Sequence, residues 1–341
     1  MPSPDPPRRR PTIADVARRA GVSAAAVSFA VNDRPGVSPD TRERILTAAR
    51  ELGWRPSASA RALTEARTRA VGLVLARNVE QLELDAFFVR FFAGVERVLT
   101  AADYALLLQL VPGGADAALP AYERLAAAGR VDGFLLTDIE LDDPRFALLE
   151  AAGVPVVLAG RPAGACPFEW VETRHEEGLH APVEHLAALG HERIAFFGGR
   201  ADLEHVRVRT ERWREAIAAA GVEEGLVVHA DDDELAAAAD VLLSVAPTAV
   251  VCASDVHALA VVVAARARGL DVPRDVSVTG FDDSPLAALA APGLTSVRVD
   301  YGEFGEAVAA ALLATIGVGE ARAFAPSAPE LVVRGSTAPP G

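Results

Sequence analysis

The segment of residues 11–63 constrains the fold most, because it combines successive helix starts with a tight turn. Thr12 and Asp15 form a capping pair at the start of a first predicted helix, and Gly21 suits the left-handed position that ends it. Ser23 begins a second predicted helix directly after the turn. Two short helices joined by a glycine-containing turn of about three to four residues are typical of a helix-turn-helix.

A third helix start and the distribution of charge complete this head. Ser38 followed by Pro39 is a strong start, because proline at the first helical position loses no hydrogen bond. Residues 1–69 contain 13 arginines and 7 acidic residues, a net charge of +6, whereas the rest contains 20 arginines and 40 acidic residues, a net charge of −20. The alternative is a three-helix bundle with no nucleic-acid role. Neutralisation of phosphates requires a basic surface, so we expect the head to bind double-stranded DNA and the acidic body to face away from it.

Length and composition set further bounds. A chain of 341 residues predicts roughly two or three domains. No apolar run approaches the ~18 residues of a membrane helix. The first ten residues lack a secretory signal and are typical of a disordered arm. Cys166 and Cys252 have no neighbours at metal-binding spacing, so we expect no metal site and two small hydrophobic residues in a reducing cytoplasm.

From residue 70 short apolar runs alternate with amphipathic segments. The runs include AVGLVLA, VDGFLL, RIAFFGG and VSVTGF, and the helical patterns cover residues 87–101, 117–128, 178–189, 209–220 and 256–268. This alternation predicts right-handed crossovers and parallel sheets covered on both faces. Roughly ten strands in two groups indicate two similar lobes. Ligands of such sheets bind beyond the carboxyl ends of the strands, so we expect an effector in the cleft between the lobes.

Specific motifs extend over nearly the whole chain after residue 10. They include TIADVARRAGVS, VSPDTRERIL and ELGWRPSASARAL in the head, and HLAALGHERIAFFGG and GLDVPRDVSVTGFDD in the body. In order and spacing the chain resembles the lactose/galactose repressor family of bacterial transcriptional regulators. The resemblance implies a body with the fold of periplasmic sugar-binding proteins, in which the chain crosses between lobes near residues 170, 297 and 328.

The resemblance and the sequence patterns together predict the domain boundaries. We expect an arm at 1–10, a helix-turn-helix at 11–56, a hinge helix and linker at 57–69, and an effector-binding and dimerisation domain at 70–338. Within the body, lobe 1 should comprise residues 70–170 and 298–327, and lobe 2 residues 171–297 and 328–338. The fold class is thus α/β, with an all-α head joined by a hinge helix to a two-lobed body of parallel sheets.

The resemblance also implies which residues contact DNA, with the second helix in the major groove. The predicted base-facing residues are Ser23, Ala24, Ala25, Ser28 and Phe29. The predicted phosphate-binding residues are Thr12, Asn32, Ser38, Thr41 and Arg42. The predicted hinge helix carries Ser57, Ala60 and the minor-groove wedge Leu63. Alanine and phenylalanine cannot make the bidentate hydrogen bonds that read bases, so we expect sequence specificity to depend on the hinge and on DNA shape. The alternative for Phe29 is a packing residue of the helical bundle.

Residues at predicted strand ends are the candidates for the effector site. The resemblance places Arg207 and Asp282 where family members hold an effector, and the two could bracket a polyol with charge-assisted hydrogen bonds. A surface ion pair for Arg207 and a turn cap for Asp282 are the alternatives. The further candidates at or after strand ends are Phe88, Arg161, Ser254 and Asp255. Phe88 has packing as its alternative, because Phe87, Phe91 and Phe92 surround it.

These predictions favour a homodimeric, effector-responsive repressor that recognises a near-palindromic operator. The chain lacks a GxSxG motif, a phosphate-binding loop and a GxGxxG after a strand, so we expect neither an enzyme nor a cofactor. A sugar is the favoured effector, because arginine and aspartate suit pairs of hydroxyls. A nucleobase or a partner protein is the alternative signal.

Overall fold

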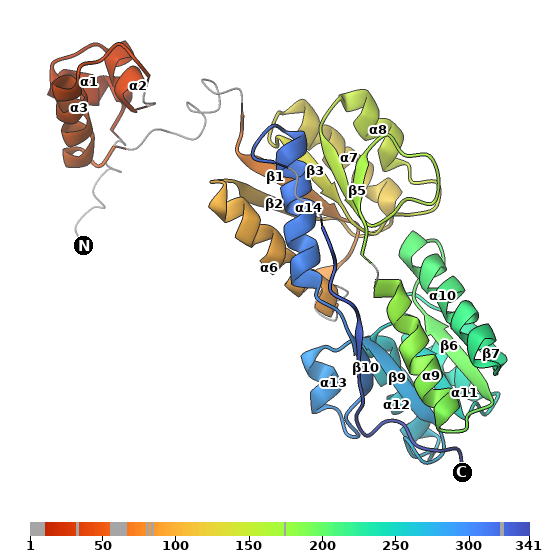
Figure 1. Ribbon diagram of the computed structural model, residues 1–341. Helices are drawn as coiled ribbons and strands as arrows, with labels where there is room; N and C mark the ends of the chain where they lie inside the picture. Colours follow the sequence, from red (N-terminus) through yellow and green to blue (C-terminus); the bar gives the residue numbers. More distant parts are fainter. Residues whose placement is uncertain are drawn as a thin grey trace, which may run out of the picture. The chain divides into compact units, whose positions relative to one another are not determined.

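The computed structural model describes residues 11–31, 34–54, 67–79, 82, 85–173, 175–320 and 324–341, without the side chains of residues 175 and 176. The chain divides into two compact units, Met1–Thr68 and Arg69–Gly341 (Figure 1). The secondary structure of the first unit, over its described residues, is helical, and the second unit contains two sheets with helices on their faces. The predicted α/β fold class with a helical head and a two-sheet body is confirmed.

The head contains α1 (Ile13–Ala20), α2 (Ala24–Val31) and α3 (Pro39–Glu51). Thr12 and Asp15 form a reciprocal capping box, and Gly21 ends α1 with φ 65° in the left-handed region. The Ser38 hydroxyl accepts a hydrogen bond from the Thr41 amide at the start of α3. The three helices close over a small core whose fully buried members are Val16, Val27 and Ile45. Local capping and this apolar stripe together determine the helix-turn-helix.

The first sheet of the body is entirely parallel, with strand order β2-β1-β3-β4-β5. The strands are β1 (Ala70–Leu75), β2 (Ala105–Leu110), β3 (Gly133–Leu136), β4 (Val156–Ala159) and β5 (Glu169–Val171). One face packs against α6 (Ala86–Ala101) and α14 (Tyr301–Thr315), and the other against α7 (Ala115–Ala127) and α8 (Arg145–Ala152). Leu73 and Val74 are both buried on opposite faces, which is why these strands are apolar throughout.

The second sheet has strand order β11-β10-β9-β8-β6-β7, and only β11 is antiparallel to its neighbour. Its strands are β6 (Arg193–Gly198), β7 (Glu223–His229), β8 (Ala249–Cys252), β9 (Ser277–Asp282), β10 (Thr295–Arg298) and β11 (Glu330–Val332). One face is covered by α9 (His180–Ala188), which follows η1 (His175–Leu179), and by α10 (Glu204–Ala220). The other face is covered by α11 (Leu235–Leu243) and α12 (Asp255–Ala267), and α13 (Pro285–Leu289) follows β9.

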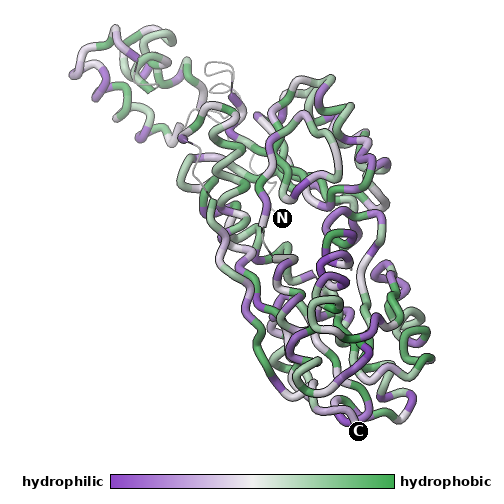
Figure 2. Tube along the Cα trace, turned by 45° about the vertical axis from the view of Figure 1, so that its right-hand side comes forward, coloured by the Kyte–Doolittle hydropathy of each residue, from purple (hydrophilic) through white to green (hydrophobic). Residues whose placement is uncertain are grey.

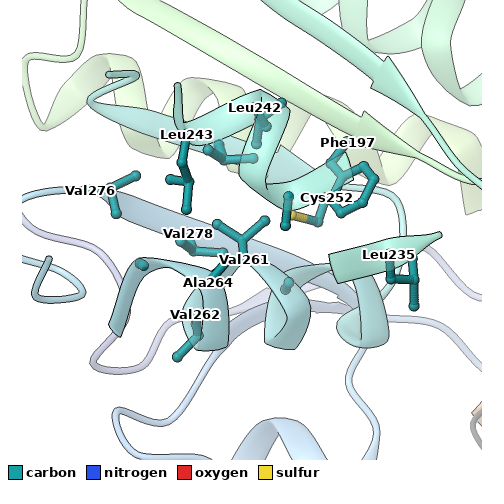
Figure 3. Packing of buried hydrophobic residues seen from close by; sticks show 14 of the residues in the cluster. Phe197, Leu235, Leu242, Leu243, Cys252, Val261, Val262, Ala264, Val276 and Val278 are labelled. Atoms are coloured by element: carbon teal, nitrogen blue, oxygen red, sulfur yellow. The ribbon is translucent and has the colours of Figure 1, made fainter. Parts of the chain in front are cut away.

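The α11–α12 face of this sheet forms an aliphatic core (Figure 3). Val261 of α12 and Leu242 of α11 point toward Cys252 and Val278 on the strands. Cys252 is fully buried in this cluster, and Cys166 is a partly buried free thiol packed near the core of the first sheet. Burial raises the pKa of both thiols. Cys252 therefore acts as a small apolar side chain.

The chain passes between the two sheets three times. It leaves the first sheet after β5, returns after β10 to form α14, and enters the second sheet again at β11 (Figure 1). Figure 2 shows hydrophobic and hydrophilic residues interspersed along the helices, as amphipathic helices covering a sheet require. Among the described residues, no helix is both long and apolar enough to span a membrane.

Candidate functional site

A cavity of about 160 Å³ lies between the two sheets of the body, at the carboxyl ends of their strands. From the first lobe it is lined by Arg77 after β1 and by Thr137 and Asp138 after β3. From the second lobe it is lined by Arg200 after β6 and by Asp232 after β7, among others. Parallel strands place their carboxyl ends on one edge of a sheet, so polar residues distant in sequence meet here.

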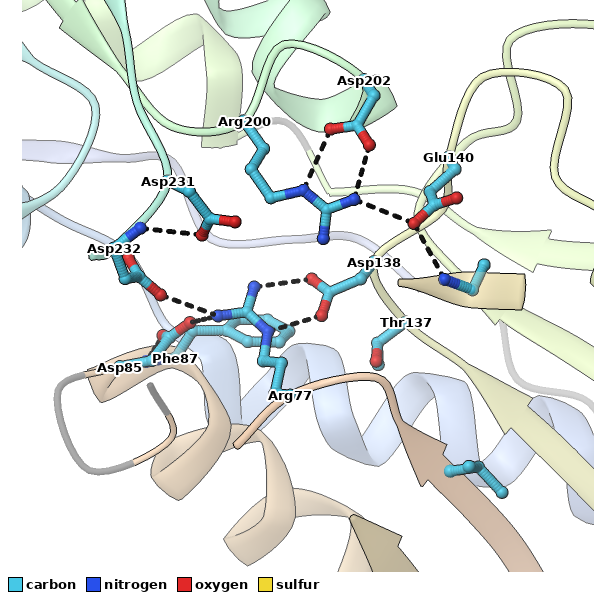
Figure 4. A network of polar contacts seen from close by, with 12 residues as sticks. Arg77, Asp85, Phe87, Thr137, Asp138, Glu140, Arg200, Asp202, Asp231 and Asp232 are labelled. Carbon is cyan, nitrogen blue, oxygen red and sulfur yellow. Dashed lines mark hydrogen bonds and ion pairs between the residues drawn. The ribbon is translucent and has the colours of Figure 1, made fainter. Parts of the chain in front are cut away.

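Arg77 is the centre of the charged network in Figure 4. Its guanidinium donates to both carboxylate oxygens of Asp138, at 2.7 and 3.0 Å, and to Asp85 at 3.2 Å. The Asp232 carboxylate of the other lobe lies 3.9 Å from the same group. Burial is the largest single effect on Asp138 and would raise its pKa, but the charge and hydrogen bonds of Arg77, with the charge of Arg145, together lower that pKa to about 2. In contrast, burial raises the pKa of Asp85 to about 6, even though Arg77 acts in the opposite direction. Arg77 therefore stabilises the ionised form of Asp138 more than that of Asp85.

A second cluster joins Arg209 of α10, Tyr301 of α14 and Asp282 at the end of β9. The Tyr301 hydroxyl donates to Asp282 at 2.6 Å and accepts from Arg209 at 3.4 Å. Arg209 also donates to the Ala253 carbonyl and lies 4.6 Å above the ring of Phe281. Burial raises the pKa of Asp282 to about 8. Asp282 has φ 101°, a strained backbone conformation of the kind that concentrates at functional sites.

Two uncharged histidines complete the pocket wall. Burial, followed by the charge of Arg209, lowers the pKa of His205 to about 3 and that of His257 to about 4. His257 Nδ1 lies 2.6 Å from the hydroxyl of Ser254, which also caps α12 by accepting from the His257 amide. Both rings are therefore neutral at physiological pH and offer polar nitrogens without charge.

Direct contacts join the two lobes beside the pocket. Arg200 of the second lobe donates to Glu140 of the first at 3.0 Å, and Glu140 also accepts from the first amide of α7. A short antiparallel bridge adds two backbone hydrogen bonds between the lobes. The Leu141 amide donates to the Asp202 carbonyl, and the Glu204 amide donates to the Ile139 carbonyl. These contacts place the loop after β3 against the loop after β6.

Ser254 and Asp282 are the predicted effector residues that the structure brings into the pocket wall. Arg207 is not among the lining residues. It lies on the outer side of α10, 39% exposed, with hydrogen bonds to Glu204 and Glu211. The helical pattern suggested a start at residue 209, but α10 begins at Glu204. Residues two apart on a helix differ by about 200° in direction, so Arg209 faces the pocket and Arg207 faces solvent.

Three further predictions of effector contacts also fail to match the pocket wall. Phe88 is fully buried in the core of the first lobe, where Arg77 lies over its ring, and Phe87 lines the pocket instead. The Arg161 side chain is 65% exposed and lies 3.8 Å from Glu172. Asp255 is buried behind the wall, where it accepts hydrogen bonds from the Ser284 amide and the Ser296 hydroxyl. Packing explains Phe88, structural hydrogen bonds explain Asp255, and Arg161 is a solvent-exposed residue near Glu172.

Sequence reasoning missed most of the polar wall. The missed residues are Arg77, Asp85, Thr137, Asp138, Arg200, His205, Arg209, Asp231, Asp232, His257 and Tyr301. Arg77, Asp138 and Arg200 directly follow apolar strand patterns, and that position was the available signal. Tyr301 comes from the start of α14, on the other side of a lobe crossing, and no local pattern indicates its contact with Asp282.

The predicted base-facing residues of the head lie on or directly before α2. Ser23, Ala24, Ala25 and Phe29 are exposed, and Ser28 is half-buried. Phe29 is 39% exposed, with its ring beside Gly36, so it combines some packing with an accessible surface.

Most of the predicted phosphate contacts lie at helix starts. Thr12 and Ser38 are the N-caps of α1 and α3, at the helix ends whose dipoles favour anions. Thr41 bonds to Ser38, and Arg42 donates to the carbonyls of Ala30 and Arg34. The predicted contacts Asn32, Ser57, Ala60 and Leu63 lie outside the described residues.

Comparison with known proteins connects this head with this two-lobed body. A sequence profile of "Bacterial regulatory proteins, lacI family" matches residues 12–57, and one of a "Periplasmic binding protein-like domain" matches residues 183–337. The HTH-type transcriptional regulator CelR of Thermobifida fusca is 39% identical over 303 residues, which are 85% of this chain and 87% of that protein. The chain belongs to the lacI family of bacterial regulatory proteins. It is thus a transcriptional regulator, as the motifs of the head and body predicted.

Other lacI-family proteins resemble the chain over nearly its full length. The HTH-type transcriptional regulator MalR of Streptomyces coelicolor is 36% identical and covers 96% of both chains. The solved structure of a CelR–cellobiose complex has a TM-score of 0.71 and 35% identity, and covers 96% of this chain and all of that one. The lac repressor dimer bound to operator and the anti-inducer ONPF has a TM-score of 0.82 and 25% identity, over 97% of this chain and all of that one. These relatives are regulators, in agreement with the expectation that the chain is not an enzyme.

Proposed function

We propose that this regulator is a repressor that binds a near-palindromic operator as a homodimer, and that a sugar in the pocket between the lobes controls its operator affinity. The head presents exposed residues on α2 and the polar N-caps Thr12 and Ser38 at two helix starts, a surface suited to base edges and phosphates. A two-fold symmetric dimer matches the symmetry of a palindromic operator.

The polar pocket is the observation that carries the effector part of the proposal. The Thr137 hydroxyl and the Arg209 Nε are buried, line the pocket, and have no hydrogen-bond partner within the described part of the chain. Leaving such groups unpaired costs about 1–3 kcal/mol each. A ligand rich in hydroxyl groups supplies partners to a hydroxyl, a guanidinium and the neighbouring carboxylates together.

The dimensions and the relatives also support a sugar. An engineered cavity of about 150 Å³ admits a benzene ring, and the cavity here, of about 160 Å³, therefore has room for a small ligand or for part of a larger one. The similar CelR structure is a complex with cellobiose. The aromatic side chains Phe87 and Tyr301 meet edge to face at 4.9 Å, so they do not form the parallel pair that would enclose a nucleobase.

Arg209→Ala and its matched control Arg207→Ala test the proposal on one helix. An operator is first selected from random duplex DNA with the full-length protein. Its affinity is then measured with and without glucose, maltose and cellobiose. We expect one of these sugars to change operator affinity in the wild type and in Arg207→Ala, but not in Arg209→Ala.

Calorimetry with and without operator supplies an independent measurement. Thermodynamic linkage requires the sugar's affinity to change with operator by the same factor as operator affinity changes with sugar. Equal sugar responses of the two arginine variants would contradict the pocket assignment. A response to a nucleobase or a protein, but to none of the sugars, would replace the sugar in the proposal.

A further inference from the structure

The pocket wall has more negative than positive groups. Five aspartates and three arginines line the pocket, a formal charge of −2 with every aspartate ionised and of −1 with Asp282 protonated, as its pKa of about 8 implies at neutral pH. The aspartates are Asp85, Asp138, Asp231, Asp232 and Asp282. The two histidines add no positive charge, because burial lowers the pKa of each to well below neutrality. An entering ligand therefore meets an excess of carboxylates.

Two of the three arginines are already matched by acids of the protein. Arg77 is held by both oxygens of Asp138 and by Asp85. Arg200 donates to both oxygens of Asp202 and to Glu140. An acidic ligand could use either arginine only by displacing a carboxylate into a pocket that already contains an excess of them.

Arg209 is the remaining arginine, and an aspartate lies close to it through Tyr301. Its guanidinium is oriented by the Ala253 carbonyl, the Phe281 ring and Tyr301. Tyr301 in turn donates to Asp282, so the carboxyl group of Asp282 lies one hydroxyl away from Arg209. Burial raises the pKa of Asp282 to about 8, so its carboxyl group repels an anion at Arg209 only where the pH is high enough to ionise it.

Asp231 and Asp232 add acceptors from the loop after β7 (Figure 4). The Asp232 carboxylate lies 3.9 Å from Arg77, beyond hydrogen-bond distance. The Arg77 guanidinium thus faces three carboxylates, the other two being Asp85 and Asp138. Burial raises the pKa of Asp232, and the neighbouring acids add to the increase. Ionised carboxylates accept hydrogen bonds and donate none, so a matching ligand must bring donors.

We propose that the pocket selects sugars without an acidic group and excludes sugars that carry a carboxylate or phosphate. This selectivity rests on the proposed function of the pocket as an effector site. Hydroxyl groups, or an amino group, supply donors to the aspartates, whereas a phosphate or carboxylate adds negative charge that two matched arginines cannot neutralise.

Matched ligand pairs test the selectivity in the full-length protein. Calorimetry and thermal shift would compare glucose with glucose 6-phosphate and glucuronate, maltose with maltobionate, and cellobiose with cellobionate. We expect any neutral sugar that binds to bind at least about tenfold more tightly than its acidic counterpart, because partly buried like charges repel strongly. The affinity of glucosamine should be at most about threefold lower than that of glucose, because its ammonium group is attracted by the acidic wall.

Asp232→Asn and its control Asp233→Asn identify the source of the selectivity. Both changes remove one carboxylate from the same loop, but Asp233 is exposed and is not among the lining residues. We expect Asp232→Asn to reduce the ratio of neutral to acidic affinity by about three- to tenfold, as loss of one nearby charge requires. Asp233→Asn should leave that ratio within about twofold, because its charge is screened by solvent. Asp85→Asn, which keeps a capping side chain, is a second variant with the same expected direction.

Each outcome decides between the two proposals. Tighter or equal binding of an acidic sugar would overturn the charge selectivity and leave the effector site intact. An unchanged affinity ratio in both Asp232→Asn and Asp85→Asn would also overturn it. Binding of none of these sugars, with operator affinity unaffected by all of them, would overturn the proposed sugar control and the selectivity together.

Discussion

Arg145 should anchor the pocket loop after β3, and its replacement by methionine tests this role. The Arg145 side chain is 2% exposed and that of its partner Asp143 is fully buried. Four hydrogen bonds leave the guanidinium: two to Asp143, one to the Thr137 carbonyl and one to the Asp138 carbonyl. Arg145 thus connects the start of α8 to both first-lobe residues that line the pocket after β3.

The magnitude follows from what Arg145→Met leaves behind. The Asp143 carboxylate would keep the amides of Glu140 and Arg145 as donors but would lose Arg145, the cation with which it forms a buried ion pair. Removing one member of a buried ion pair costs about 3–5 kcal/mol. This loss is a large part of the ~5–15 kcal/mol that stabilises a domain. A domain of this size loses about 2–4 °C of melting temperature per kcal/mol, so the body should melt roughly 10 °C lower.

Urea and thermal unfolding of the full chain would measure the effect, with Arg124→Met as control. Arg124 is an exposed arginine on α7, and its replacement should change the free energy of unfolding by less than about 0.5 kcal/mol. Asp143→Asn combined with Arg145→Met should recover part of the loss, because no buried carboxylate remains uncompensated. A loss below about 1 kcal/mol in Arg145→Met would refute the reasoning, since an unpaired buried carboxylate cannot cost so little.

Three further changes test other parts of the structure. Asp282 has a pKa raised to about 8, so its contribution to stability is complete below about pH 4 and is lost as pH rises through 8. Between these pH values the free energy of unfolding of the wild type should decrease by up to about 1.4 kcal/mol per pH unit. Asp282→Asn should make this decrease smaller. An equal slope for the wild type and the variant in urea titrations from pH 5 to 9 would contradict this prediction. Gly305→Ala should lower the free energy of unfolding by about 1–3 kcal/mol in the same titrations, because the new Cβ would collide with the Phe91 carbonyl where α14 meets α6. Gly164→Ala is the control. Its Cβ would meet no atom within 4 Å, so it should leave the free energy of unfolding unchanged. Operator affinity should fall steeply between 50 and 200 mM salt, and Arg42→Met should reduce the log–log slope by about 1 in binding titrations.

The head was predictable from sequence because its determinants are local. The Thr12–Asp15 capping box, the left-handed Gly21 and the Ser38–Pro39 start each act within a few residues, and all three appear in the structure. The two-lobed body followed from the alternation of strands and helices and from the family resemblance. The order of strands within each sheet was not predicted, because strand pairing such as β1 beside both β2 and β3 depends on contacts far apart in sequence.

The pocket residues were harder to predict because the direction of a side chain depends on the phase of its helix. The sequence HVRVRTERW contains Arg207 and Arg209, and the resemblance pointed to Arg207, whereas Arg209 lines the pocket. Only the actual start of α10 at Glu204 determines which arginine faces the cleft. Asp255 shows the same limit, since it begins a helix at a strand end but points to Ser284 and Ser296 behind the wall.

The distances around Arg77 suggest how a ligand could act on the lobes. Asp138 and Asp85, on the same lobe as Arg77, are within hydrogen-bond distance of its guanidinium, whereas Asp232 on the other lobe is 3.9 Å away. A donor-rich ligand placed against Asp232 and Asp138 would connect the lobes through hydrogen bonds that the protein alone does not make. A ligand can shift a conformational equilibrium only by binding one state better than another. Because acceptors of both lobes line the pocket, the strength of such bonds depends on the separation of the lobes, and this dependence would give the proposed effector the differential affinity that regulation requires.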